Sequence, residues 1–427
     1  MPSLRTVALA ETEWRPRSSA KTAEEMTPLV VGTTDPIIKA LTSPLTPEEE
    51  RPLPVKAEGE RTIRLSGKDY VDAAEAVNQL FIGRRWSDGL PVVPPTEEAV
   101  KRMLSGTSRS PQEVIGQIAP AGGKAAVEKM AINTVMAGGK PEYLPVILTA
   151  MEVLADKNFD LVHLQNSLGG MTPVVVVSGP ITQELNMNYD IGLFGFGWRA
   201  NATIGRSIRL NLINLGHSWP GINRMAMTGS PGEFTSWCIA EHPANPWTSL
   251  TAEFGHPPTD SSVTVFGVMA KGPVMVGGAG SNVSDAESTL ESLATGMKLA
   301  YEPYHFASYG LSYFLIVLGP TDAATLAKAG WTKDKLRSWL YANAQVPFST
   351  IMVKDRLKLR DLIASGRVPK LWDVKDEKAL VPLVIKPEDI WITVAGSAPG
   401  GSVVFNAIRA QRGAKVIRGA TLTQAGR

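Results

Sequence analysis

The chain has 427 residues and a formal net charge of +2, and 44% of its residues are hydrophobic. These values are ordinary for a globular protein, and they give no field that would indicate nucleic acid or an anionic membrane as a partner. The single cysteine, Cys238, excludes an intrachain disulfide and every metal or redox motif that needs two cysteines. The five histidines form no close pair, so we expect no metal site.

No targeting or membrane segment is predicted. The first residues lack the apolar core of a secretory signal, and apolar runs such as 174–177 and 312–318 are far too short to cross a bilayer. Low cysteine use fits a reducing compartment. We therefore expect a cytoplasmic protein without a membrane partner.

Residues 1–60 differ from the rest because they are rich in Pro, Glu, Thr, Ser and Lys and almost free of aromatic residues. Such a segment buries too little apolar surface to offset the entropy lost on ordering. We expect an extended or disordered arm. Its apolar patches at 28–31 and 37–38 leave open an arm that binds a partner.

From about residue 61, apolar residues at helical spacing alternate with short buried runs. The expected helices lie at residues 71–82, 99–104, 125–137, 141–154, 202–215, 284–299, 321–329 and 332–343. The expected strands lie at residues 172–178, 263–268, 273–276, 313–318 and 390–395, with 263–268 paired to 273–276. This alternation predicts an α/β fold with mixed or parallel sheets, in two domains at residues 61–262 and 263–427.

Residues 192–206 form the strongest candidate site. A glycine-rich loop leads to Asn201, an expected N-cap, and then to the amphipathic helix at 202–215, whose first turn contains Thr203. Free N–H groups at a helix start attract anions, and Arg199 and Arg206 can each clamp a carboxylate or phosphate. The alternative is a tight loop around a core helix, with Arg206 and Arg209 simply solvated.

Two further segments offer weaker candidates. The proline-rich segment 86–96 carries Asp88 as an acid or hydrogen-bond acceptor. A segment of this composition more often has only a structural role, as a connection between elements of the fold. On the helix at 125–137, Glu128 and Lys129 would form an acid/base couple if both were buried, and Asn133 lies one turn beyond Lys129. A solvated helix face is the alternative for these residues.

Glu241 and His242 are an adjacent carboxylate and imidazole, the usual partners in acid/base catalysis. Neighbours on a strand point to opposite faces, which argues against direct pairing. Cys238 lacks any local sign of activation and is expected in the core. Tyr304 with His305, and the glycine-rich turn at 396–402 after a buried strand, are lesser candidates.

Four motifs resemble segments of a bacterial family that is related to, or occurs with, the UGSC family of (seleno)proteins. They are WSDGLPVVPPTE at 86–97, VEKMAIN at 127–133, KPEYLP at 140–145 and GWRANATIGR at 197–206. The resemblance covers residues 70–264 well and the remainder more loosely. It implies reductive or carbon–heteroatom chemistry with a chalcogen nucleophile on a partner chain. This chain has no U-G-S-C or C-x-x-C motif and no cysteine around residues 122–139, which puts a thiol role for it alone in doubt.

Together these patterns predict an enzyme, or the substrate-binding subunit of a heteromeric enzyme, that acts on a small anionic organic molecule. A lyase or hydrolase step is favoured over an oxidoreductase step. Two alternatives stay open: a non-catalytic scaffold completed by a partner, and a redox subunit whose thiol or selenol lies on another chain. The sequence identifies no cofactor, and a homo-oligomer or hetero-oligomer is expected.

Overall fold

The computed structural model describes residues 23–44, 62–226, 229–269, 274–276, 286–301, 312–351, 353–366, 370–397 and 401–418. The chain divides into two units, residues 1–66 and 67–427. In the first unit, helix α2 (Ala23–Thr42) occupies part of the segment expected to be extended or disordered. That expectation rested on composition, which does not register local helix formation. The side chains of Val31, Ile37 and Ile38 on α2 are exposed.

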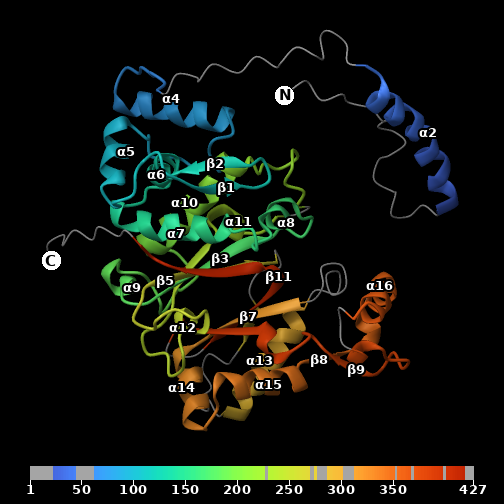
Figure 1. Ribbon diagram of the computed structural model, residues 1–427. Helices are drawn as coiled ribbons and strands as arrows, with labels where there is room; N and C mark the ends of the chain where they lie inside the picture. Colours follow the sequence, from blue (N-terminus) through green and yellow to red (C-terminus); the bar gives the residue numbers. More distant parts are fainter. Residues whose placement is uncertain are drawn as a thin grey trace. The chain divides into compact units, whose positions relative to one another are not determined.

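The second unit is built around a seven-stranded sheet (Figure 1). Its strands are β3 (Thr172–Ser178), β4 (Trp237–Ala240), β5 (Ser262–Val268), β6 (Val274–Val276), β7 (Ser312–Leu318), β10 (Ile390–Val394) and β11 (Ser402–Val416). Their order is β10-β7-β11-β5-β3-β4, and β6 pairs with β11. The pairs β3–β4 and β7–β10 are parallel and the others antiparallel, so the α/β fold with a mixed sheet is confirmed.

The sheet curls until its two edge strands meet. The main-chain N–H of His242, just after β4, donates to the carbonyl of Val394 in β10 at 2.7 Å. Thr393 of β10 donates its hydroxyl to Glu241 at 3.3 Å. Alternate residues of the strands fill the concave side, which forms one apolar core. This core includes Val174, Val176, Ile239, Phe266, Val268, Tyr313, Leu315, Val317 and Phe405.

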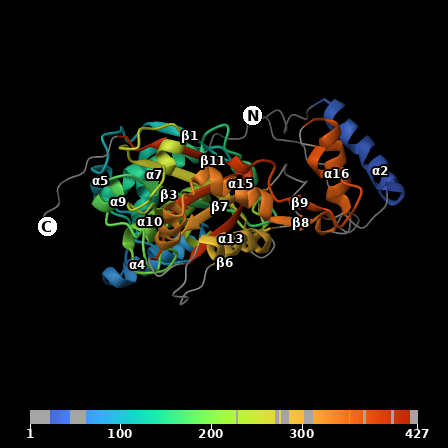
Figure 2. The ribbon, with the colours of Figure 1, turned by 90° about the horizontal axis from the view of Figure 1, so that it is seen from below.

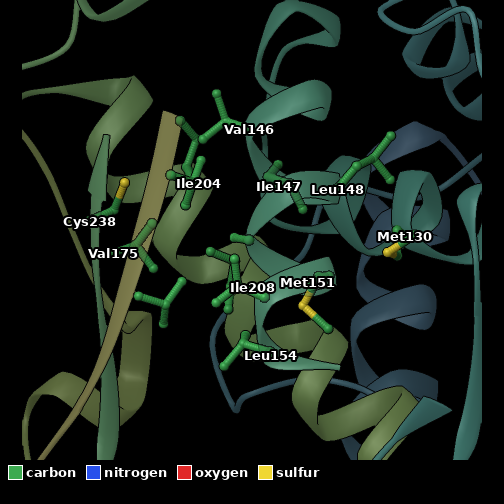
Figure 3. Close-up of a cluster of buried hydrophobic side chains, with 14 of the residues drawn as sticks. Met130, Val146, Ile147, Leu148, Met151, Leu154, Val175, Ile204, Ile208 and Cys238 are labelled. Atoms are coloured by element: carbon green, nitrogen blue, oxygen red, sulfur yellow. The ribbon is translucent and has the colours of Figure 1, made fainter. Parts of the chain in front are cut away.

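Helices cover the convex side in two layers, each with its own apolar core. On one side, α7 (Leu144–Leu154) and α10 (Arg199–Gly216) pack on β3 and β5. Figure 3 shows Ile208 of α10 between Val175 of β3 and Met151 of α7. On the other side, α13 (Ala286–Ala300), α14 (Pro320–Lys328) and α15 (Lys333–Asn343) lie near β7 (Figure 1), and their buried apolar residues share a core with those of β7 and β10.

Shorter elements complete the second unit. They are α4 (Tyr70–Gly83), α5 (Glu97–Leu104), β1 (Val114–Ile118), β2 (Gly123–Ala126), α6 (Val127–Met136), η2 (Pro141–Tyr143), α8 (Leu161–Asn166), α9 (Ile181–Glu184), α11 (Gly232–Thr235), α12 (Leu250–Glu253), β8 (Gln345–Pro347), η3 (Phe348–Thr350), α16 (Val353–Ala364), η4 (Lys370–Trp372), β9 (Leu380–Pro382) and η5 (Pro387–Asp389). Helix α16 lies beside the β8–β9 pair (Figure 2). None of the helices in the described ranges is long and apolar enough to cross a membrane.

One expectation about strand pairing fails, and the sheet crosses the expected domain boundary. Strand β5 pairs with β3 and β11, and β6 pairs with β11, so the predicted pairing of 263–268 with 273–276 is wrong. The predicted domain boundary at residue 262 coincides with the start of β5, and strands from both sides of it share the one sheet. The first difference follows from β11, which pairs with both β5 and β6, and the second from the β3–β5 pair, which joins the strands on the two sides of residue 262. Short-range periodicity registers neither pairing.

One packing contact on α10 leads to a stability prediction. A Cβ at Gly205 would lie 2.2 Å from the carbonyl oxygen of Ser236 and 2.4 Å from that of Thr235. We expect Gly205→Ala to lower the free energy of unfolding by about 1–3 kcal/mol, although alanine favours helix, because the backbone must shift. Gly83→Ala in α4 is the control, since no atom lies within 4 Å of its Cβ position. Equal stability of the two variants in urea melts would contradict the prediction.

Candidate functional site

The glycine-rich loop before α10 is anchored in the concave core. Leu193 is buried there, and the ring of Phe194 packs edge-on against Trp237 and Phe405, with centroids 6.3 and 5.6 Å away. Phe196, two residues later, is 98% exposed. The loop is therefore fixed at one end and open to solvent at the other.

Helix α10 begins at Arg199, with Trp198 as its N-cap residue and no side-chain cap. The expectation that Asn201 caps the helix is therefore wrong. The buried Asn201 amide donates to the carbonyls of Asn188 and Cys238 at 3.0 and 3.1 Å and accepts from the N–H of Asn188 at 2.8 Å. Its side chain joins the helix to β4 and to the loop that begins at Asn188, a long-range role that the local sequence does not reveal.

Arg199 lies at the open start of α10. Its Nε and Nη2 both donate to the carbonyl of Gly138, at 3.1 and 2.9 Å, and Nη1 makes no hydrogen bond to a described residue. The hydroxyl of Thr203 donates to the Arg199 carbonyl at 2.8 Å. Burial raises the pKa of Tyr143, and the positive charge of Arg199 opposes that shift. The guanidinium is thus held beside a helix start whose first N–H groups lack a side-chain acceptor.

Arg206 has a different role from the one expected. It donates to both carboxylate oxygens of Asp88 at 2.8 and 3.0 Å, and to the carbonyl of Pro91 at 2.8 Å. The side chain of Asp88 is 3% exposed. The bidentate pair satisfies both charges and fastens the proline-rich segment to α10. Arg206 is therefore no free anion clamp, and Asp88 is a structural acceptor.

Asn133 is buried in a chain of amides. It donates to the side chain of Asn211 at 2.9 Å and accepts from Asn214 at 2.7 Å, so it is unavailable to a ligand. Glu128 and Lys129 are exposed, and the buried acid/base couple suggested for them does not form. Asn133 forms a hydrogen bond with the main-chain carbonyl of Lys129 and none with the Lys129 side chain. The helix turns the two charges outward and the amide inward, as its period requires.

Glu241 follows the last residue of β4 and is buried. It accepts from the amide of Asn245 at 3.0 Å, and from the Leu250 N–H and the Thr393 hydroxyl at 3.3 Å each. Burial raises the pKa of this carboxyl, and the charge of Lys333 opposes the shift. A carboxyl in such surroundings holds its proton to a higher pH than a solvated one.

No hydrogen bond joins the side chains of His242 and Glu241 in the described part of the chain. Its Nδ1 accepts from the N–H of Ala244 at 3.0 Å, so the neutral ring carries its proton on Nε2. Its ring lies edge-on to Tyr189, with centroids 4.9 Å apart. Burial lowers the pKa of His242, and the charge of Asp190 opposes that shift. The Oδ1 atom of Asp190 is buried without a hydrogen-bond partner.

Residues 188–190, which the sequence reasoning missed, connect these groups. The carbonyl of Asn188 accepts from the N–H of Ala240 at 3.4 Å, and that of Tyr189 accepts from Gly396 at 2.8 Å. The start of α10, the end of β4 and the turn after β10 therefore meet at one loop. Its sequence NYD, shortly after the buried strand β3, is the available signal, because loops at strand ends line ligand sites.

Other candidates do not join this cluster. Cys238 is buried, and burial raises the pKa of its thiol, as expected for a core residue. Ser402, the first residue of β11, donates its hydroxyl to Asp322 at 2.9 Å, and residues 398–400, Tyr304 and His305 lie outside the described residues. The described part of the chain holds no group of three or more His, Cys, Asp or Glu residues that could bind a metal ion.

Comparison of the sequence with family models and with curated proteins gives no match. The site is therefore interpreted from its own geometry.

The Asp190–His242 proximity gives a second prediction. Asp190→Asn removes the charge that raises the pKa of His242, so we expect that pKa to fall below its wild-type value. The imidazole proton resonances, followed by NMR against pH, provide the measurement. Asp373→Asn changes an exposed carboxylate and is the control. An unchanged or higher pKa in Asp190→Asn would show that the two groups do not interact.

Proposed function

We propose that the chain is an enzyme, or the substrate-binding subunit of a heteromeric enzyme, that acts on a small anionic organic molecule in the cytoplasm. One observation carries the proposal: Arg199 is fixed at the uncapped start of α10, on the same loop region that carries Asp190 beside His242. A carboxylate or phosphate would accept from Arg199 Nη1 and from the first N–H groups of the helix.

The acid/base chemistry falls to Glu241 and His242. Burial moves the pKa values of the two in opposite directions, raising that of the carboxyl and lowering that of the imidazole. The shift of the Glu241 pKa brings the carboxyl nearer to neutrality, and the shift of the His242 pKa favours the neutral imidazole, the form that accepts a proton. A lyase or hydrolase step requires one proton taken and one given. Glu128 and Lys129 have no part in it, because both are exposed.

A redox role requires a second chain. The only cysteine is buried, and its raised pKa disfavours the thiolate. If the resemblance to the UGSC-associated family reflects common chemistry, the thiol or selenol is supplied by a partner polypeptide, and this chain binds the anionic substrate.

Arg199→Ala tests the binding site. We expect the Kd for small carboxylates and inorganic phosphate, measured by isothermal titration calorimetry, to rise about tenfold or more, because a charge-assisted hydrogen bond contributes about 1.5–3 kcal/mol. Arg102→Ala removes an exposed arginine of α5 and should leave the Kd unchanged. Equal affinities in wild type and Arg199→Ala would reject the site.

A scaffold role is the second candidate, and the exposed apolar residues of α2 favour it. Val31, Ile37 and Ile38 are 61%, 41% and 51% exposed, a pattern suited to docking on another surface. On this proposal, a chain lacking residues 1–60 has a smaller assembly mass by light scattering than the full chain. An unchanged mass would remove the case for docking through this arm.

A further inference from the structure

Arg209 lies on α10 one turn beyond Gly205 and is 3% exposed. The alternative suggested by the sequence, a solvated Arg209, is therefore wrong. Its Nη2 donates to the hydroxyl of Thr172 at 2.9 Å, whereas its buried Nε makes no hydrogen bond. A buried guanidinium with a single neutral acceptor is far from satisfied, because it carries five N–H donors and a full charge.

The nearby carboxylates are paired with other arginines. Arg224 donates from Nε to Glu233 at 2.8 Å and is further fixed by the carbonyl of Met171 at 2.8 Å. Asp88 is bound bidentately by Arg206. No carboxylate of the described chain forms a salt bridge with Arg209. One positive charge is therefore buried in excess at this place.

Residues 230–236, which include α11, lie over Arg209. Thr172 donates its hydroxyl to the carbonyl of Gly232 at 2.8 Å, and the Ser236 carbonyl packs against the Gly205 position one turn before Arg209. Three buried polar atoms of this segment lack a partner: Ser230 Oγ, Ser236 Oγ and Glu233 Oε1. With Arg209 Nε, the buried atoms without a hydrogen-bond partner on these two segments are one cationic donor, two hydroxyls and one carboxylate oxygen.

Burial and the charge of Arg224 lower the pKa of Arg209 to about 9. The side chain is still cationic at neutral pH, so the excess charge persists under ordinary conditions. An unpaired buried charge is strongly unfavourable unless a counter-charge reaches it.

We propose that Arg209 forms the floor of a buried site for a small oxyanion that carries its own hydroxyl, such as bicarbonate or glycolate. The anion neutralises Arg209 and accepts from its Nε and from Ser236. Its hydroxyl donates to Glu233 Oε1, which a plain halide or acetate cannot satisfy. The site is separate from the one proposed at Arg199, which is exposed and contacts Gly138.

Thermal unfolding with glycolate, at constant ionic strength, tests the site against Arg209→Met, which keeps a similar side-chain length without the charge. Without glycolate, we expect the variant to melt at or above the wild-type Tm, because a buried uncompensated charge is removed. With rising glycolate the wild-type Tm increases more than that of the variant, which keeps only the contribution of the Arg199 site. Equal shifts in both proteins, or none in wild type, would overturn the proposal.

Two controls separate this site from its alternatives. Arg199→Ala should still gain more stability from glycolate than the double variant with Arg209→Met, and loss of the whole shift in Arg199→Ala would assign the anion to the Arg199 site instead. Acetate should stabilise wild type less than glycolate, and an equal effect would overturn the role of Glu233.

A crystal grown with glycolate provides a test that does not depend on folding of the variant. We expect ligand density within hydrogen-bond distance of Arg209 Nε. An ordered water or an empty space at that place would overturn the proposal.

Discussion

The hydrogen bond from the His242 N–H to the Val394 carbonyl joins the two edges of the central sheet. Edge strands otherwise leave a row of unpaired polar groups, and here the edges partly satisfy one another. The contact also brings the end of β4 and the end of β10 together, which places Glu241 against Thr393. The candidate acid/base residues owe their surroundings to this junction rather than to their own neighbours in sequence.

Much of the fold could be predicted because its signals are local. The valine run of β3 is buried on both faces, and Thr96, a residue type favoured before a helix, accepts from the N–H of Ala99 at the start of α5. Strand β11 could not be predicted in the same way. Its residues 409–415 alternate poorly, with Arg412 and Gly413 in a stretch that reads as a loop. Only its pairing with β5 and β7 makes it a strand.

The candidate site shows the same division between local and distant causes. The sequence pointed to the start of α10 and to Glu241–His242, and the structure links the two through residues 188–190. The sequence could not show which arginine of α10 is already paired with a carboxylate of the chain. Arg206 is matched by Asp88, more than a hundred residues away, whereas Arg199 has only a carbonyl. Residue type indicates what a side chain is able to bind, and the fold determines which of its hydrogen-bond donors are still available to a ligand.

The place of β11 in the sheet has a consequence for synthesis. Strand β11 lies between β5 and β7 in the sheet and pairs with both, but it follows both in sequence. During synthesis, β5 and β7 therefore leave the ribosome before their shared partner has been made. Until then, two apolar strands expose free edges, the kind of surface that invites association with other chains. The contacts that close the sheet span long stretches of sequence, which slows folding. Chaperone protection during this interval would matter more for this protein than for one whose sheet is assembled in sequence order.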